Sequence, residues 1–148
     1  MKLLFIEDDY IIRNSFRDYL STLFNYIYEV SDGKDAFRIY EEVKPDIILL
    51  DINLPSIDGI SIAKKIREID KETIIIILSA REDTETFLDA TTLGLTKYLL
   101  KPIPRREFKK FITEAVMKVK SNNHKSIQLI DDFVSWIFLL FLDNTFSS

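Results

Sequence analysis

The sequence predicts an α/β fold in which helices cover both faces of a parallel sheet. Residues 3–6, 47–50 and 74–78 are short, continuously apolar runs, as expected of parallel strands that are buried on both faces. Between these runs, apolar residues recur at intervals of three and four, which is the period of a helix. Because strands and helices alternate, the crossovers should be right-handed, and a ligand should bind at the carboxyl ends of the strands.

The alternation continues through five pairs of a strand and a helix. Residues 26–30 and 98–100 are two weaker strand candidates. The fifth helix has the clearest pattern, because Pro104 suits a first helical turn and apolar residues recur from Phe108 to Val119. We expect Lys118 and Lys120 to end this helix. The stripes that indicate the first four helices are Ile12 with Phe16, Tyr19 and Leu23, Phe37 with Tyr40, Ile62 with Ile66, and Phe87 with Ala90.

The composition is that of a globular protein with one core. The 148 residues are 47% hydrophobic and 30% charged, with 3 Gly and 4 Pro. A net charge of -4 without a basic cluster predicts that the chain does not bind nucleic acid directly. The absence of cysteine excludes disulfides, thiolate metal sites and cysteine nucleophiles. Met1 and Lys2 lead into a strand rather than a signal peptide, so we expect a cytoplasmic protein with no membrane partner.

Acidic residues follow two of the predicted strands. Glu7, Asp8 and Asp9 come directly after the first strand, and Asp51 comes directly after the third. Two carboxylates about 4 Å apart repel by roughly 4 kcal/mol at an effective dielectric constant near 20, so such a cluster requires a cation or a raised pKa. Ligands that are all oxygen favour Mg²⁺. The sequence therefore predicts a magnesium site at this edge of the sheet.

The same edge is predicted to carry a hydroxyl group and an ammonium group. Ser79 follows the fourth strand and Lys101 follows the fifth. These groups can hold a phosphoryl oxygen. A lone acid in such a position more often caps a helix or begins a loop. Here the acids, the hydroxyl and the ammonium occur together, which favours a site that binds phosphoryl groups.

Over residues 1 to 120, these motifs resemble the response-regulator receiver domains of two-component signalling. The resemblance implies a flavodoxin-like, doubly wound sheet of five parallel strands in the order 2-1-3-4-5. It also implies a signalling switch rather than an enzyme. The matching elements are the acid pair Glu7 and Asp8, then Asp51 with Pro55 and Gly59, Ser79 with Ala80, and Tyr98 with Lys101 and Pro102.

The resemblance assigns a role to each matching residue. Asp51 would be the phosphoacceptor nucleophile, and Ser79 and Lys101 would bind the phosphoryl group. Ser79 and Tyr98 would form the switch, and the bond before Pro102 would be cis. The resemblance also implies a sensor histidine kinase as partner and a downstream effector reached through the fourth helix, fifth strand and fifth helix. The implied Mg²⁺ ligands are Asp8, Asp51, the backbone carbonyl of Asn53, and Glu7 acting through water.

Three consecutive acids leave the register of the acid pair open. Either Glu7 and Asp8 or Asp8 and Asp9 could be the metal-binding pair. The first alternative is preferred because Glu7 directly follows the strand. Asp9 would then begin the next helix.

Other functions agree less well with the residues. A phosphatase of the haloacid-dehalogenase type needs a second Asp two residues after the nucleophile, where this chain has Asn53. A nucleotide-binding protein would need a glycine-rich phosphate loop, and the glycines are scattered. His124, the only histidine, lies in a polar stretch and is an unfavourable phosphohistidine candidate. A receiver-like interaction module that is never phosphorylated is the remaining alternative.

Residues 121–148 form a separate segment after the receiver-like part. A polar linker at 121–126 precedes a strongly apolar stretch at 127–142. Its uncharged part is shorter than the roughly 20 residues that a membrane-spanning helix needs. The segment is either a dimerising helix, which would make the protein a homodimer, or the start of a truncated effector domain of a transcriptional regulator. The spacing of three and four that suggests dimerisation is carried by Ile127, Ile130, Val134, Ile137 and Phe141.

Overall fold

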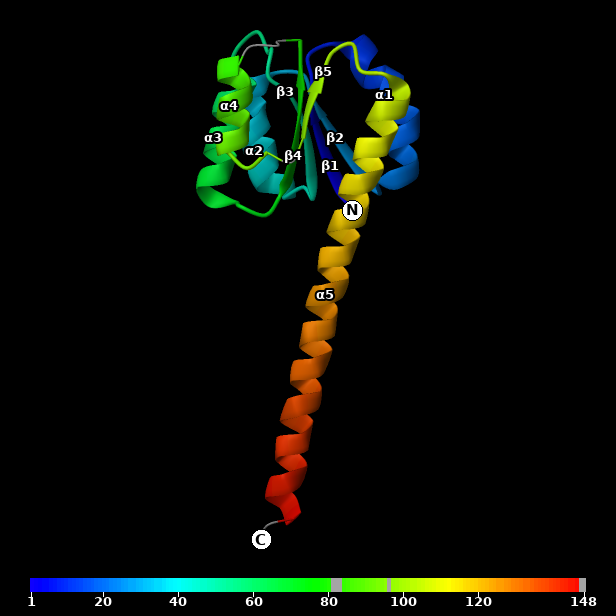
Figure 1. The fold of residues 1–148 in the computed structure, drawn as a ribbon, viewed down its shortest axis with the longest axis vertical. Coiled ribbons are helices and arrows are strands. Elements are labelled where there is room, and N and C mark those ends of the chain that lie inside the picture. Colours follow the sequence, from blue (N-terminus) through cyan, green and yellow to red (C-terminus); the bar gives the residue numbers. More distant parts are fainter. Residues whose placement is uncertain (81–83, 96, 147–148) are drawn as a thin grey trace. The chain divides into compact units, whose positions relative to one another are not determined.

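The computed structural model describes residues 1–80, 84–95 and 97–146, and its central feature is a parallel five-stranded sheet (Figure 1). The strand order is β2-β1-β3-β4-β5, and all four neighbouring pairs are parallel. The predicted fold class and strand order are therefore confirmed. The strands are β1 (Lys2–Ile6), β2 (Tyr26–Val30), β3 (Ile47–Asp51), β4 (Ile74–Ser79) and β5 (Lys97–Leu100).

Helices cover both faces of the sheet. In Figure 1, α2, α3 and α4 lie on one side of the strands, and α1 lies on the other side with the first turns of α5. On that second side, the ring of Phe16 in α1 stacks on that of Phe108 in α5, with 3.8 Å between ring centroids. The helices are α1 (Tyr10–Leu23), α2 (Gly33–Val43), α3 (Gly59–Ile69), α4 (Thr84–Thr92) and α5 (Arg105–Phe146).

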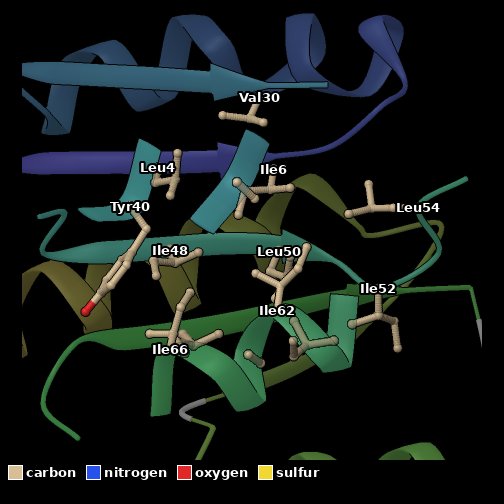
Figure 2. Packing of buried hydrophobic residues seen from close by; sticks show 14 of the residues in the cluster. Leu4, Ile6, Val30, Tyr40, Ile48, Leu50, Ile52, Leu54, Ile62 and Ile66 are labelled. Carbon is tan, nitrogen blue, oxygen red and sulfur yellow. The ribbon is translucent and has the colours of Figure 1, made fainter. Parts of the chain in front are cut away.

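The core between the sheet and α2 and α3 explains the continuous apolar runs. Side chains alternate between the two faces of a strand, so a strand covered on both faces must be apolar at every position. Leu4 and Ile48 belong to the core cluster on this face, together with Ile66 of α3 (Figure 2). Each fully buried leucine or isoleucine side chain stabilises the fold by about 1.5–3 kcal/mol. This rigid sheet fixes the positions of the loops at its carboxyl edge.

The fifth helix is longer than the sequence pattern predicts. The expected end at Lys118 and Lys120 is wrong, because α5 continues to Phe146 and includes the stretch expected to be a linker. That stretch, residues 121–126, contains no glycine or proline, so no residue in it interrupts the helix. Within this stretch, the hydroxyl of Ser126 donates a hydrogen bond to the backbone carbonyl of Asn122, one helical turn earlier, at 3.0 Å, so this polar side chain bonds within the helix.

The chain divides into two compact units, and the boundary falls within α5. The first unit comprises Met1–Ala115 and the second begins at Val116. Within the part of the chain that the structure describes, none of the helices combines the length and the apolar character needed to cross a membrane.

Candidate functional site

Three carboxylates meet at the carboxyl edge of the sheet. Glu7 and Asp8 follow β1 directly, and Asp51 is the last residue of β3. One carboxylate oxygen from each lies within 4.8 Å of the others. Glu7 and Asp51 are 0% and 2% exposed, whereas Asp8 is open to solvent. Because strands β1 and β3 are paired in register, their ends bring these acids together.

Asp9 has a different environment from the other two acids of the run. It is the N-cap of α1, and its carboxylate accepts hydrogen bonds from the backbone N–H groups of Ile11 at 2.8 Å and Ile12 at 3.3 Å. Capping satisfies N–H groups that have no partner inside the helix. This geometry supports Glu7 and Asp8 as the acid pair.

Lys101 connects the two buried carboxylates. Its ammonium donates to both carboxylate oxygens of Glu7, at 2.9 Å each, and to Oδ2 of Asp51 at 3.1 Å. The backbone N–H of Lys101 donates to the carbonyl of Ser79 at 2.7 Å, and the bond between Lys101 and Pro102 is cis. One ammonium thus accompanies the three carboxyl groups of Glu7, Asp8 and Asp51, and this excess of acidic groups favours a further cation.

The protonation of the site reflects its burial. Burial raises the pKa of Glu7 to about 7; Asp51 adds to this rise, and Lys101 opposes it. Burial alone would lower the pKa of Lys101, but its bonds and charge interactions with Glu7 and Asp51 together raise that pKa. Lys101 is therefore charged near neutral pH, and burial favours the protonated form of Glu7.

Ser79 and Asn53 complete the edge. The hydroxyl of Ser79, which is fully buried at the end of β4, donates to Oδ1 of Asn53 at 3.4 Å. The backbone N–H of Ala80 donates to the same oxygen at 2.9 Å. The backbone N–H of Asn53 in turn donates to Oδ1 of Asp51 at 2.8 Å. The sequence prediction concerned only the backbone carbonyl of Asn53, and no pattern in the sequence indicated its side-chain contacts.

Gly59 allows the loop after Asp51 to stay close to the strand. A Cβ atom on Gly59 would lie 2.5 Å from Cα of Ile52 and 2.6 Å from the carbonyl oxygen of Asp51. Gly59 also donates its backbone N–H to the carbonyl of Ile52 at 3.2 Å. A side chain at this position would displace the backbone that carries Asp51, which gives a physical reason for glycine here. Pro55 is exposed in the same loop.

Tyr98 lies on β5 and faces α4. Its half-buried ring contacts the ring of Phe87 edge to face, with 5.9 Å between centroids. The two side chains line a hollow of about 280 Å³ together with Lys97 and Leu95. The structure thus brings Glu7, Asp8, Asp51, Asn53, Ser79 and Lys101 together and places Tyr98 against the neighbouring helix.

The donor set fits a magnesium ion. All the side-chain ligands offered by Glu7, Asp8 and Asp51 are carboxylate oxygens. Mg²⁺ is a hard cation that binds one or two carboxylates and keeps several waters, whereas transition metals favour nitrogen and sulfur ligands. The exposed carboxylate of Asp8 leaves one side of the cluster open to water.

Comparison with known proteins agrees with this geometry. Residues 3–113 match the family model described as the response regulator receiver domain. The solved signal receiver domain of a DNA binding response regulator protein (merR) from Colwellia psychrerythraea 34H is 26% identical, with a TM-score of 0.72. That match covers 79% of this chain and 98% of the solved chain.

Curated relatives with similar sequences are longer proteins. AfsQ1, a transcriptional regulatory protein of Streptomyces coelicolor, is 35% identical over 104 residues, which make up 70% of this chain and 46% of AfsQ1. SrrA, a transcriptional regulatory protein of Staphylococcus aureus, is 35% identical over 106 residues, or 72% of this chain and 44% of SrrA. The chain therefore spans about half the length of the curated relatives it matches.

Proposed function

Because the chain belongs to the response-regulator receiver family, whose members are signalling switches of two-component systems, we propose that Asp51 is its phosphoacceptor. The observation that carries this proposal is the set of contacts at Asp51. One carboxylate oxygen accepts from Lys101 and the other from the N–H of Asn53, while Asp8 lies at the same edge. The carboxylate is thus held in a fixed orientation at the end of a rigid strand.

In the proposed reaction, an oxygen of the Asp51 carboxylate attacks the phosphorus of the donor and forms a new P–O bond. The bond from phosphorus to the donor's leaving group breaks, and the leaving group departs with the electron pair. In a sensor histidine kinase, this donor is a phosphohistidine and the broken bond is P–N. The ammonium of Lys101 can then donate a hydrogen bond to a phosphoryl oxygen while it still donates to Glu7.

The residues proposed to hold Mg²⁺ are Asp8, Asp51 and the backbone carbonyl of Asn53, with Glu7 acting through water. When bound, the ion would neutralise the negative charge that accumulates as a phosphoryl group approaches the carboxylates. Asp8 is suited to this role because it is exposed and adds its charge to the buried pair.

Incubation with acetyl phosphate tests the proposal directly. Intact-mass measurement of the full chain is expected to show the addition of one phosphoryl group in the presence of Mg²⁺ and no addition when a chelator replaces the metal. Absence of the modified species at every donor concentration would contradict the proposed function. Modification that is unaffected by the chelator would contradict the magnesium requirement.

The output of the switch is proposed to pass through α4, β5 and α5. A phosphoryl group carries about two negative charges, and hydrogen bonds from Ser79 and Lys101 to charged oxygens are each worth about 1.5–3 kcal/mol. Together they approach the roughly 5.5 kcal/mol that moves a two-state equilibrium from 1:99 to 99:1. Tyr98 would report this change because it contacts Phe87 of α4. The effector beyond this face is proposed to be a transcriptional output, as the names of the relatives suggest.

Replacement of Ser79 tests the switch. In Ser79→Ala, Asp51 should still be phosphorylated, but the phosphorylation-induced NMR shift changes around Tyr98 should shrink by at least half, because one donor to the phosphoryl group is lost. Ser61→Ala provides a control, since Ser61 lies exposed on α3. Unchanged shifts around Tyr98 in Ser79→Ala would rule out the switch role of Ser79.

We propose a receiver domain over about residues 1–120 and a self-associating tail at 121–148. In the stretch 127–142, the polar residues Gln128, Asp131, Asp132 and Ser135 fall within about 100° of the helix circumference at 3.6 residues per turn. The large apolar side chains of this stretch are exposed. A surface of this kind rarely stays in water. The two aspartates in this polar stripe disfavour binding of the tail to an anionic membrane surface. A second copy of the chain, in contrast, could pack its own apolar face against this one.

The association of the tail can be measured by sedimentation equilibrium at micromolar concentrations. The unmodified chain is expected to form dimers or larger assemblies. The double variant Ile130→Glu with Ile137→Glu should shift the population to monomer, since it places charges in the apolar face. The matched control, Gln128→Lys with Ser135→Lys, adds two charges to the polar stripe within one helical turn of Asp131 and Asp132 and should leave the assembly intact. A monomeric unmodified chain, or an assembly that persists in Ile130→Glu with Ile137→Glu, would show that the apolar face of the tail does not mediate self-association.

A further inference from the structure

Two hydrogen-bond donors converge on one oxygen beside the proposed phosphoacceptor. Oδ1 of Asn53 accepts from the backbone N–H of Ala80 at 2.9 Å and from the hydroxyl of Ser79 at 3.4 Å. A backbone N–H can only donate, so the amide oxygen of Asn53, rather than its nitrogen, must face it. A carbonyl oxygen has two lone pairs and can accept both bonds.

Asn53 therefore connects the ends of β3 and β4. Its backbone N–H donates to Oδ1 of Asp51 at 2.8 Å, while its side chain accepts from residues at the end of β4. Ser79 is fully buried and Ala80 is exposed, so the two donors lie at the border between the core and the solvent. Donors that converge on one oxygen in this way can equally bind an oxygen that carries negative charge.

We propose that Asn53 is a positioning residue. Its side-chain oxygen accepts hydrogen bonds from the Ser79 hydroxyl and the Ala80 N–H until a phosphoryl oxygen on Asp51 replaces it as the acceptor of both. This inference rests on the proposed function, because it requires a phosphoryl group at Asp51. A charged phosphoryl oxygen accepts about twice as strongly as a neutral amide oxygen, so the exchange favours the phosphoryl group. The half-buried amide of Asn53 can then turn to water.

The competition has a measurable consequence. Both hydrogen bonds that the side-chain oxygen of Asn53 accepts in the unphosphorylated chain must be broken before Ser79 and Ala80 can bind the phosphoryl group. The amide of Asn53 therefore stabilises the unphosphorylated arrangement and lowers the net affinity for a phosphoryl group. Removing the amide while keeping the backbone should raise that affinity.

The first test measures the contact in the unphosphorylated chain. In Asn53→Ala, the NMR signal of the Ala80 amide proton should move upfield, as expected when a hydrogen bond is lost. In Asn53→Asp, which keeps an acceptor oxygen at the same place and gives it a negative charge, the signal should not move upfield. Asn14→Ala, which removes an exposed amide on α1, should leave the signal unchanged. An unmoved Ala80 signal in Asn53→Ala would overturn the proposal.

The second test measures the competition with beryllium trifluoride, a mimic of a phosphoryl group, at a fixed saturating magnesium concentration. Asn53→Ala should bind the mimic roughly five- to tenfold more tightly than the unmodified chain, as expected when the 2.9 Å bond from Ala80 is lost together with the long and weak 3.4 Å bond from Ser79. Equal or weaker binding by Asn53→Ala would overturn the competition alone. Failure of the unmodified chain to bind the mimic would overturn the proposed function, and the competition with it.

Discussion

Asp51→Asn is expected to abolish phosphorylation by acetyl phosphate or by a histidine kinase. An amide is a poor nucleophile, and the variant has no carboxylate with which to form an acyl phosphate. The fold should be retained, because the side-chain oxygen of asparagine can still accept the hydrogen bond from the backbone of Asn53, and Lys101 keeps its two hydrogen bonds to Glu7. Intact-mass measurement of the unmodified and variant chains under identical conditions checks this prediction.

Asp58→Asn is a suitable control for this substitution. Asp58 is an exposed acid in the loop that follows Asp51, and it caps α3 by accepting from the backbone N–H of Ile60 at 3.2 Å. Asparagine caps helices about as well as aspartate, so this variant should be labelled normally. Labelling of Asp51→Asn at the original rate would place the phosphoacceptor at another residue.

Asp8→Ala is expected to weaken magnesium binding at least about a hundredfold, because attraction between unit charges 4 Å apart is worth roughly 4 kcal/mol at an effective dielectric constant near 20. Phosphorylation should slow as a result. Isothermal titration calorimetry with Mg²⁺ measures the affinity directly. The result depends on the place of Asp8 beside Glu7 and Asp51 in the carboxylate cluster.

The matched control for this variant distinguishes the two registers of the acid pair. Asp9→Asn keeps the capping oxygen that accepts from Ile11 and Ile12, so α1 should remain stable. Its magnesium affinity should be close to that of the unmodified chain. A large loss of affinity in Asp9→Asn, together with little effect of Asp8→Ala, would instead support Asp8 and Asp9 as the metal-binding pair.

The convergence of the site residues could be predicted from the sequence because it follows from the topology. Once the apolar runs are identified as parallel strands, the residues that end them must meet at one edge. Asp51, Ser79 and Lys101 each follow such a run, and their backbones and side chains are joined by hydrogen bonds in the structure. The strand order, in contrast, came from the family resemblance.

Other features depend on side-chain geometry that a sequence pattern does not contain. Three consecutive acids are chemically alike, and only the capping contacts of Asp9 distinguish it from Asp8. The side-chain role of Asn53 depends on the direction of the Ala80 N–H, which no spacing rule describes. The sequence pattern underestimates the length of α5, because the polar stretch at 121–126 predicts a linker although it contains no glycine or proline.

Mapping the modified residue tests the central claim most directly. Borohydride reduces an aspartyl phosphate to homoserine with release of phosphate, so treatment of the chain after incubation with acetyl phosphate and Mg²⁺ marks the phosphoacceptor permanently. Peptide mass spectrometry should find homoserine at position 51, with Asp8 and Asp58 unchanged. Homoserine at another position with Asp51 intact, or phosphate found on His124 instead, would contradict the account.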